Sequence, residues 1–303
     1  MHFSRYRAAL VLFATLPLGG CLFHTHKVEQ IDLAALRTAT KPDLVGYINS
    51  EAAKVQSMQA TVDIDTSIGG AKKGQVTEYE QIRGFVLARK PQMLRMIGLY
   101  PIVRNRAFDM VSDGHDFKLW IPTKNRFVVG RNDVASPNPG QPLENLRPQI
   151  IYEALLLHEI SPGDTPVLEN GTETITDEKG RPHEQPDYVI DVIRTRGDDS
   201  WLSRKIIFSR LDLRPNRQLI YDEAENIVTD ARYTDYKDYD GVSFPSKIEI
   251  KRPQEEYDIT LTILKPGLNQ TLTDEKFVLD QPAGAEVIHL DGSQPTATNG
   301  GGH

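Results

Sequence analysis

The sequence predicts a mainly β protein with two helical segments, and three observations carry that prediction. Apolar and polar residues alternate from Ala60 to Ile68 and again from Tyr257 to Ile263, which is typical of strands with one solvated face. Turn signals such as Asp113-Gly114 separate several short apolar runs. Two stretches with helical spacing interrupt this strand pattern. A sheet of so many strands cannot remain flat, so we expect it to curl or close.

The first predicted element is a helix over residues 41–60. Pro42 suits a first helical turn, Asp43 favours the positive helix end, and Leu44, Tyr47 and Ile48 recur at helical spacing. Six antiparallel strands are then expected at 60–68, 77–88, 93–97, 107–112, 117–121 and 127–130.

A second helix is predicted at Pro148–Leu157, where proline precedes an apolar run. It lies inside a segment, 131–187, that otherwise breaks the strand pattern. A second series of strands is expected at 188–194, 202–211, 217–224, 227–233, 246–252 and 257–264. The Gly-, Thr- and Asn-rich tail is expected to be disordered from Gly284 onward, and above all over 291–303.

The N-terminus has the pattern of a bacterial lipoprotein signal. Basic residues at Arg5 and Arg7 precede an uncharged apolar run, Ala8–Leu18, that is too short to span a bilayer, which takes about 20 residues. Leu18-Gly19-Gly20-Cys21 resembles the lipobox, which implies that residues 1–20 are removed and that Cys21 carries diacylglycerol and an N-acyl chain such as palmitate. Alternatives are an ordinary signal peptide with an unrelated cysteine, or a buried N-terminal helix.

Composition restricts the partners of the remaining chain. Loss of Arg5 and Arg7 with residues 1–20 leaves 33 basic against 42 acidic residues, a net charge of −9 that disfavours nucleic acid. Cys21 is the single cysteine, so the body has no disulfide and no cysteine metal site. Residues 21–40 are expected to be an anchor and tether. Leu22 follows the cysteine where an aspartate would retain enteric lipoproteins in the inner membrane, which by resemblance indicates the periplasmic side of the outer membrane.

Three predicted strands are apolar on both faces. One face must pack in a core, and the other must meet a helix, another sheet or a ligand. The candidate cavity-lining residues are Leu94, Met96, Phe108, Met110, Leu119 and Trp120. Methionine suits adaptable apolar surfaces. The sequence leaves open which face is inward, and whether these residues line a cavity or simply fill the core.

The connection between two of these strands is unusually apolar. Its candidate membrane- or cargo-contacting residues are Ile97, Leu99, Tyr100, Ile102 and Val103. Hairpin connections are normally polar and exposed, so this one is either buried in the core or exposed for contact with a membrane or an acyl chain.

Residues Arg83–Gly130 resemble the lipoprotein-carrier superfamily, which includes the periplasmic carrier LolA and the outer-membrane receptor LolB. The resemblance rests on a strand ending in Lys-Pro, then Leu-Arg, Val-Ser-Asp-Gly and Leu-Trp-Ile-Pro, with weaker similarity at 239–248 and 277–284. It covers about residues 41–290, and 131–187 departs from it as an insertion. The motifs are diffuse, so they argue for fold more strongly than for activity.

The resemblance implies an unclosed antiparallel half-barrel of about eleven strands (mainly β, α+β overall) with a helical lid over an apolar face that takes acyl chains. It also implies binding of lipoprotein or lipid acyl chains for sorting or insertion, with a soluble periplasmic carrier as a possible partner. The family includes lipid-sensing regulators, so an alternative is a non-catalytic envelope scaffold or sensor that docks a protein.

We expect no enzyme, cofactor or metal centre. The chain lacks Gly-x-Ser-x-Gly, a phosphate-binding loop and His-Glu-x-x-His; His158-Glu159 lacks the second histidine. Residues 235–247 fail as a calcium loop, because Tyr236 and Lys247 occupy ligand positions.

Overall fold

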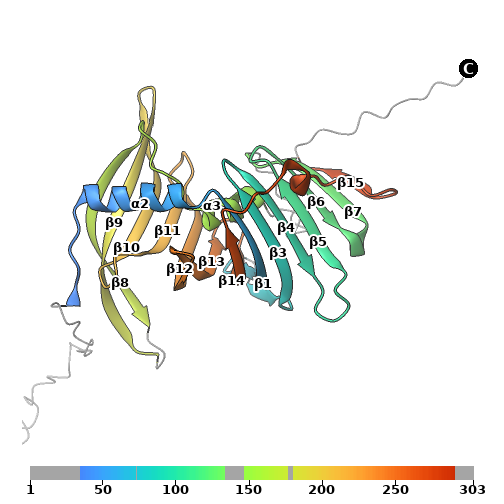
Figure 1. The fold of residues 1–303 in the computed structure, drawn as a ribbon, viewed down its shortest axis with the longest axis horizontal. Helices are drawn as coiled ribbons and strands as arrows, with labels where there is room; N and C mark the ends of the chain where they lie inside the picture. Colours follow the sequence, from blue (N-terminus) through green and yellow to red (C-terminus); the bar gives the residue numbers. More distant parts are fainter. Residues whose placement is uncertain (1–34, 73, 134–146, 177–179, 291–303) are drawn as a thin grey trace, which may run out of the picture.

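A computed structural model describes residues 35–72, 74–133, 147–176 and 180–290. These residues form one large mixed, mostly antiparallel sheet of fifteen strands with two α-helices (Figure 1). The strand order is β15-β7-β6-β5-β4-β3-β1-β14-β13-β12-β11-β10-β9-β8, and the short β2 pairs with β1 off this path. The two ends of that order do not pair with each other, so the sheet is open.

The strand bounds are as follows: β1 Ser57–Gly70, β2 Gln75–Glu78, β3 Ile82–Arg89, β4 Met93–Leu99, β5 Arg106–Ser112, β6 Asp116–Ile121, β7 Arg126–Arg131, β8 Thr165–Thr176, β9 Pro182–Arg196, β10 Asp199–Ser209, β11 Pro215–Tyr221, β12 Ile227–Tyr239, β13 Val242–Arg252, β14 Tyr257–Leu268 and β15 Glu286–His289. The helices are α2 (Lys41–Lys54) and α3 (Pro148–Leu155), and short 3-10 turns lie at η2 (Pro122–Lys124) and η4 (Asp274–Phe277).

Helix α2 begins with a capping box. The Thr40 hydroxyl caps the helix end, and the Asp43 carboxylate accepts the Thr40 backbone N–H at 2.8 Å. The helix ends at Lys54, earlier than the predicted residue 60, because β1 already begins at Ser57. Met58 and Ala60 are buried, and each pairs with a residue of β3 and a residue of β14. Cross-strand pairing therefore makes this stretch a strand instead of the last turn of the helix.

Register places one face of the sheet against both helices, and we call it the helix face. Across the strands, Ala60 lies beside Val86, Val86 beside Met96, Met96 beside Met110, and Met110 beside Leu119. Because side chains alternate between faces, this row defines the helix face of the first half of the chain. Register irregularities in β1, β4, β10 and β11 interrupt the ladder, and such bulges bend strands.

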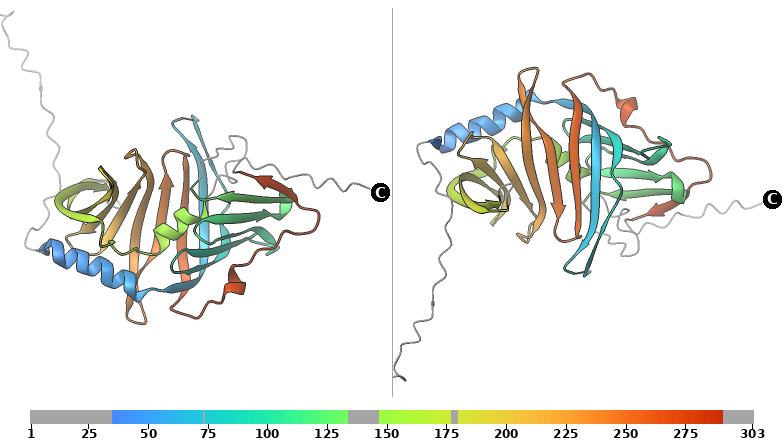
Figure 2. Two further views of the ribbon diagram at one scale, coloured as in Figure 1. Left: turned by 90° about the horizontal axis from the view of Figure 1, so that it is seen from above. Right: turned by 90° about the horizontal axis from the view of Figure 1, so that it is seen from below.

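The two helices cover different parts of the helix face (Figure 2). Leu44 and Ile48 of α2 pack against Ile190, Val192 and Phe208. The apolar side of α3 packs in the main core with residues of β1, β3–β7 and β12–β14. Helix α3 therefore contacts both halves of the sheet: β1 and β3–β7 belong to the first half, and β12–β14 to the second.

The opposite face, which we call the far face, is partly covered by the segment around η4. Leu279 and Ala285 pack there with Val111 and Phe127. Arg95 holds this segment to the sheet: its guanidinium pairs with the fully buried Asp109 at 2.8 Å and donates to the carbonyl oxygens of Lys276 and Val278.

Several predicted elements differ in the structure. The run predicted as one strand at 77–88 is divided between β2 and β3. The segment 131–187 contributes β8 and the start of β9, so the sheet exceeds the expected eleven strands. Residues 286–289, expected to be disordered, form β15 and pair in parallel with β7. Backbone pairing with a sheet edge needs little side-chain pattern, which explains why periodicity missed this strand.

Candidate functional site

The helix face contains an apolar cavity of about 310 Å³, at the lower end of the usual range for ligand pockets. Strands β1, β3–β6 and β14 supply most of its wall, and Ile151 of α3 closes one side. Its lining is Ile64, Thr66, Ile68, Tyr79, Glu80, Ile82, Met96, Tyr100, Ala107, Phe108, Leu119, Ile121, Thr123, Lys124, Ile151, Tyr257 and Ile259.

Two glycines let the cavity floor form. Gly84 and Gly98 lie opposite each other in β3 and β4. A Cβ on Gly98 would lie 2.4 Å from the Phe108 ring and 2.7 Å from Ile82 Cδ1, and a Cβ on Gly84 would lie 2.8 Å from Ile64 Cδ1. The missing side chains therefore leave the space in which these three lining residues pack.

Tyr79, Tyr100 and Lys124 line the cavity at the strand ends from which the β4–β5 connection projects (Figure 1), and we call this end of the cavity its mouth. At the tip of that connection Ile102 is 93% exposed and Val103 is 63% exposed. Two backbone hydrogen bonds, from Tyr100 N to Asn105 O and from Arg104 N to Tyr100 O, both at 3.0 Å, fix the loop and keep both side chains outside the core.

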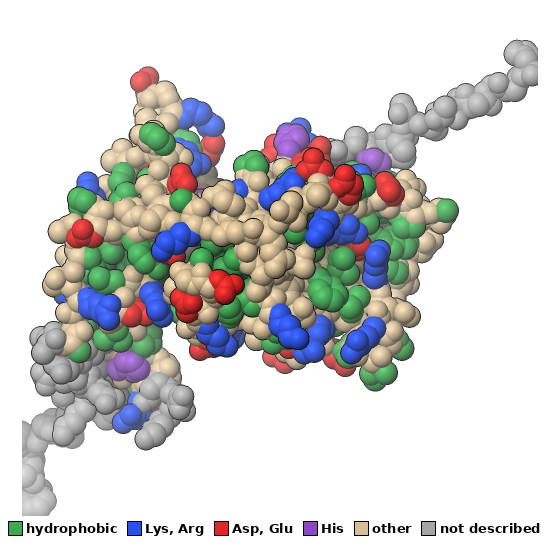
Figure 3. Space-filling model, in the orientation of Figure 1, with side chains coloured by type: hydrophobic (Ala, Val, Ile, Leu, Met, Phe, Trp, Pro, Cys, Tyr) green, Lys and Arg blue, Asp and Glu red, His purple; other side chains and the backbone are tan. Residues whose placement is uncertain are grey.

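Basic residues flank this apolar tip. Arg104 and Arg106 follow Val103 and are exposed, and Lys124 is exposed beside the mouth. Figure 3 shows apolar, Lys and Arg side chains along the lower edge of the same view, with Asp and Glu side chains among them. An apolar tip with basic neighbours combines the two interactions that attach a loop to an anionic membrane surface, burial of apolar area and attraction to head groups.

The structure divides the six predicted cavity residues into three groups. Met96, Phe108 and Leu119 line the cavity. Leu94 and Met110 lie in the same apolar cluster, fully buried and outside the cavity wall. Trp120 does not line the cavity: it packs with Val111 and Phe127 on the far face, because it alternates with Leu119 in β6.

The five predicted loop residues also separate. Ile102 and Val103 lie at the exposed tip, and Tyr100 lines the cavity mouth. Ile97 and Leu99 belong to β4 rather than to the loop, and they alternate with Met96, which places them on the far face. Cys21 lies outside the residues that the structure describes.

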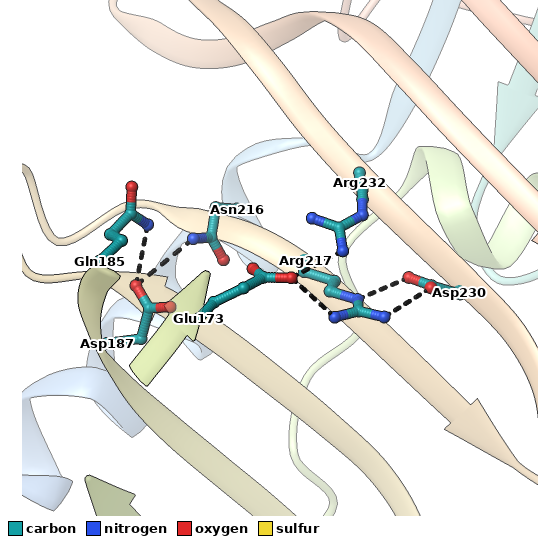
Figure 4. Close-up of polar contacts among 7 residues, drawn as sticks. All are labelled: Glu173, Gln185, Asp187, Asn216, Arg217, Asp230 and Arg232. Atoms are coloured by element: carbon teal, nitrogen blue, oxygen red, sulfur yellow. Dashed lines mark hydrogen bonds and ion pairs between the residues drawn. The ribbon is translucent and has the colours of Figure 1, made fainter. Parts of the chain in front are cut away.

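A polar network occupies the far face at the other end of the sheet (Figure 4). The Arg217 guanidinium donates to both Asp230 oxygens at 2.7 Å and to Glu173 at 2.9 Å, and Arg232 donates to the same Glu173 oxygen at 2.7 Å. The charges compensate one another, so we interpret this group as a structural brace between β8, β11 and β12.

Asp187 lies beside this brace and is 2% exposed. One of its oxygens accepts from Gln185 at 2.9 Å and from Asn216 at 3.5 Å, and the other has no hydrogen-bond partner in the described part of the chain. Burial raises the pKa of Asp187 to about 6, and the Glu173 carboxylate acts in the same direction.

Comparison with solved structures gives matches to LolA superfamily proteins. A LolA superfamily protein from Nitrosomonas europaea is 16% identical, covers 78% of this chain and 97% of its own, and has a TM-score of 0.46. A DUF1329 family protein from Desulfovibrio piger is 14% identical over 78% of this chain and 95% of its own, also at 0.46. A provisionally assigned outer membrane lipoprotein-sorting protein domain from Vibrio parahaemolyticus is 15% identical over 77% and 95%, again at 0.46. No protein-family model and no curated protein matches the sequence.

Sequence reasoning missed the part of the cavity wall contributed from outside the carrier-like segment. Thr66 and Ile68 of β1 and Ile259 of β14 complete the wall. Their alternation showed one apolar face, but only pairing of β1 with β14 brings these two segments, distant in the sequence, together. In the described residues, no helix is long and apolar enough to cross a membrane.

Proposed function

We propose that this protein binds a fatty-acyl chain of a lipid or lipoprotein in the apolar cavity of the helix face. The carrying observation is the cavity itself, which adjoins the main core and has a mostly apolar lining. Each methylene that enters such a site contributes about 0.8 kcal/mol, so a chain of modest length would be held without any directional contact.

The sheet and α3 would act as an open half-barrel with a helical lid. Ile151 presents α3 to the cavity, so movement of that helix would open the wall. The exposed tip, Ile102 and Val103, would touch the membrane while Tyr100 marks the entrance for the acyl chain. Binding and release would involve no covalent step.

The same proposal gives the N-terminus its role. A signal peptide over 1–20 and acylation of Cys21 would hold the protein on the periplasmic side of the outer membrane, with 21–40 as tether. The protein would then bind acyl chains close to the lipid surface into which they are inserted, either from lipids or from a lipoprotein brought by a periplasmic carrier.

A pair of variants on one strand tests the cavity. Thr66→Trp would fill it, because Thr66 lines the wall, whereas Ser67→Trp is the matched control on the opposite face of β1. We expect the full mature chain to bind a fluorescent fatty-acyl probe, Thr66→Trp to weaken binding at least tenfold, and Ser67→Trp to leave it unchanged. Native mass spectrometry of gently purified protein should also show bound acylated species.

Absence of probe binding to the unmodified chain, together with a mass free of bound lipid, would overturn the proposal. Equal binding by Thr66→Trp and the unmodified chain would place the probe elsewhere. In either case, the alternative of a scaffold or sensor that docks a protein partner would become the leading explanation.

A further inference from the structure

A second cavity lies on the other side of α3, and its chemistry is the reverse of the first. This cleft, of about 870 Å³, is walled by β9–β11, by the segment after α3, and by the β3–β4 turn. Its lining is Gln56, Lys90, Pro91, Gln92, Gln149, Glu153, His158, Glu159, Ser161, Arg194, Trp201, Ser203, Arg204, Gln218, Ile220 and Tyr221. We call it the polar cleft.

Arg204 is the central cation of the polar cleft. Its guanidinium donates to the backbone carbonyls of His158 at 3.0 Å and Glu159 at 3.5 Å, and no carboxylate in the described chain lies within ion-pair distance of it. Carbonyl oxygens orient a guanidinium without neutralising it. Burial lowers the pKa of Arg204 to about 10, which still leaves it charged at neutral pH.

Other charges in the polar cleft strengthen this positive character. Lys90 belongs to the same wall, and among the described residues its amine donates to the carbonyl of Ala52. Burial lowers the pKa of Lys90, and the Glu159 carboxylate acts in the opposite direction. Burial raises the pKa of the Glu153 carboxyl, and the hydrogen bond from Gln149 acts in the opposite direction. Burial also lowers the pKa of His158 to about 4, so that ring is neutral at pH 7. Arg194 is paired with Asp164 at 3.3 Å, and Glu159 is exposed.

Polar atoms without partners occur on both sides of the cleft. They are Gln149 Oε1 on α3, Gln218 Oε1 on β11 and His158 Nε2, each without a hydrogen-bond partner in the residues described. Gln218 is 1% exposed, so its carbonyl is costly to leave unpaired. The terminal torsion of glutamine is broad, and a small rotation would turn either amide oxygen toward a ligand.

We propose that the polar cleft binds a phosphate ester whose alcohol part carries free hydroxyl groups. Arg204 and Lys90 would donate hydrogen bonds to the phosphate, and the Gln149 and Gln218 side-chain carbonyls would accept from the hydroxyl groups. Arginine pairs with phosphate through two parallel N–H donors, and lysine adds a point charge. A bare anion would leave the two carbonyls unpaired, and a neutral polyol would leave the cations unpaired. This site is separate from the acyl-chain cavity and does not depend on it.

Calorimetric titration of the full mature chain with sn-glycerol 3-phosphate tests the proposal. We expect saturable binding that is at least tenfold tighter than that of inorganic phosphate, glycerol or glycerate. Arg204→Met should weaken it at least tenfold. Arg83→Met is the matched control, because Arg83 is an exposed arginine paired with Asp63 outside the cleft.

A second variant keeps the test independent of folding, because Arg204 also holds the segment after α3. Ser161→Trp adds bulk at an exposed position of the cleft wall and should weaken glycerol 3-phosphate binding without loss of the folded far-ultraviolet dichroism spectrum. Unchanged binding in both Arg204→Met and Ser161→Trp would overturn the assignment, as would failure of the unmodified chain to bind. Glycerate binding as tightly as glycerol 3-phosphate would overturn the choice of phosphate.

Two further arms identify the source of the phosphate and separate the sites. Tighter binding of a short-chain phosphatidylglycerol than of glycerol 3-phosphate would support a lipid head group, and the opposite order would support a free metabolite of the same chemistry. The fatty-acyl probe should bind Arg204→Met as it binds the unmodified chain. Displacement of that probe by glycerol 3-phosphate would show a single shared site and would overturn the proposal.

Discussion

The helix face of the sheet has two halves that meet at α3, and they present opposite chemistry to it. Toward β1 and β3–β6, residues such as Met96, Phe108 and Ile151 enclose an apolar cavity. Toward β9–β11, Arg204, Gln218 and Glu153 enclose a polar cleft. The difference shows that one continuous sheet can carry two cavities of different chemistry when a helix divides its covered face. The following predictions test how far the halves are independent.

The largest expected effect comes from Arg95, which attaches the segment around η4 to the far face of the apolar half. Arg95→Met would leave Asp109, which is 0% exposed, without its closest guanidinium, and would release the contacts with Lys276 and Val278. Breaking a buried ion pair costs about 3–5 kcal/mol, and Arg106 at 3.1 Å would offset only part of that. Urea unfolding should show the loss.

If the halves are independent, glycerol 3-phosphate binding should survive in whatever fraction of Arg95→Met is folded. Arg83→Met is the matched control, because Arg83 forms an exposed pair with Asp63 and should cost less than about 1 kcal/mol. A loss from Arg95→Met no greater than that of the control would show that the far-face pair is unimportant.

The next effect is a pH dependence at Asp187, which lies on the far face of β9, a strand of the polar half. Asp187 has a folded pKa of about 6, above the usual value for aspartate, so the folded state binds more protons than the unfolded state between about pH 4 and pH 6. Stability should therefore rise as the pH falls through that window. Asp187→Asn should remove this dependence, which amounts to about 3 kcal/mol in unfolding free energy across the window.

Chemical unfolding at a series of pH values would measure this slope. Asp198→Asn, at an exposed position of the same half, is the control and should retain the dependence. A flat profile for the unmodified chain between pH 4 and pH 6 would contradict the assignment of a raised pKa to Asp187.

A smaller effect, of opposite sign, is expected in the polar cleft. Gln218→Met replaces a buried amide whose carbonyl has no partner with an apolar side chain of similar length. Removing an unpaired buried polar group should raise the stability of the ligand-free protein by about 1 kcal/mol, less whatever the contact from Gln218 to Glu153 contributes. Thermal unfolding should show a higher midpoint, while glycerol 3-phosphate binding weakens. A lower midpoint would indicate that Gln218 serves packing rather than a ligand.

The smallest effect on stability is expected at the loop tip. Ile102→Asn with Val103→Asn changes two side chains that are already in water, so unfolding free energy should move by less than about 0.5 kcal/mol. Sedimentation with anionic vesicles should nevertheless fall about tenfold, because two apolar side chains no longer enter the lipid. Undiminished sedimentation of this variant would remove the loop from the membrane contact.

The sequence alone determined the fold class and much of the first half of the chain. Alternation in 60–68 and 257–263 established one apolar face for each of two strands, and the Asp113-Gly114 turn was placed correctly. The carrier-like segment singled out Met96, Phe108 and Leu119, which line the cavity, and the connection with Ile102 and Val103, which is exposed. The sequence left open whether the former lie in a cavity or the core and whether the latter are buried. These features are local, because period and turn chemistry act over a few residues.

Tertiary structure decided the rest, because it depends on which distant strands become neighbours. Pairing of β1 with β14 completed the cavity wall, and the pairing register of β6 turned Trp120 to the far face. The polar cleft has no sequence motif at all: His158, Arg204 and Gln218 come from separate elements that converge only when α3 packs across the sheet. The charge of Arg204 is notable only because the side chain is buried and no described carboxylate pairs with it, and the fold sets both conditions.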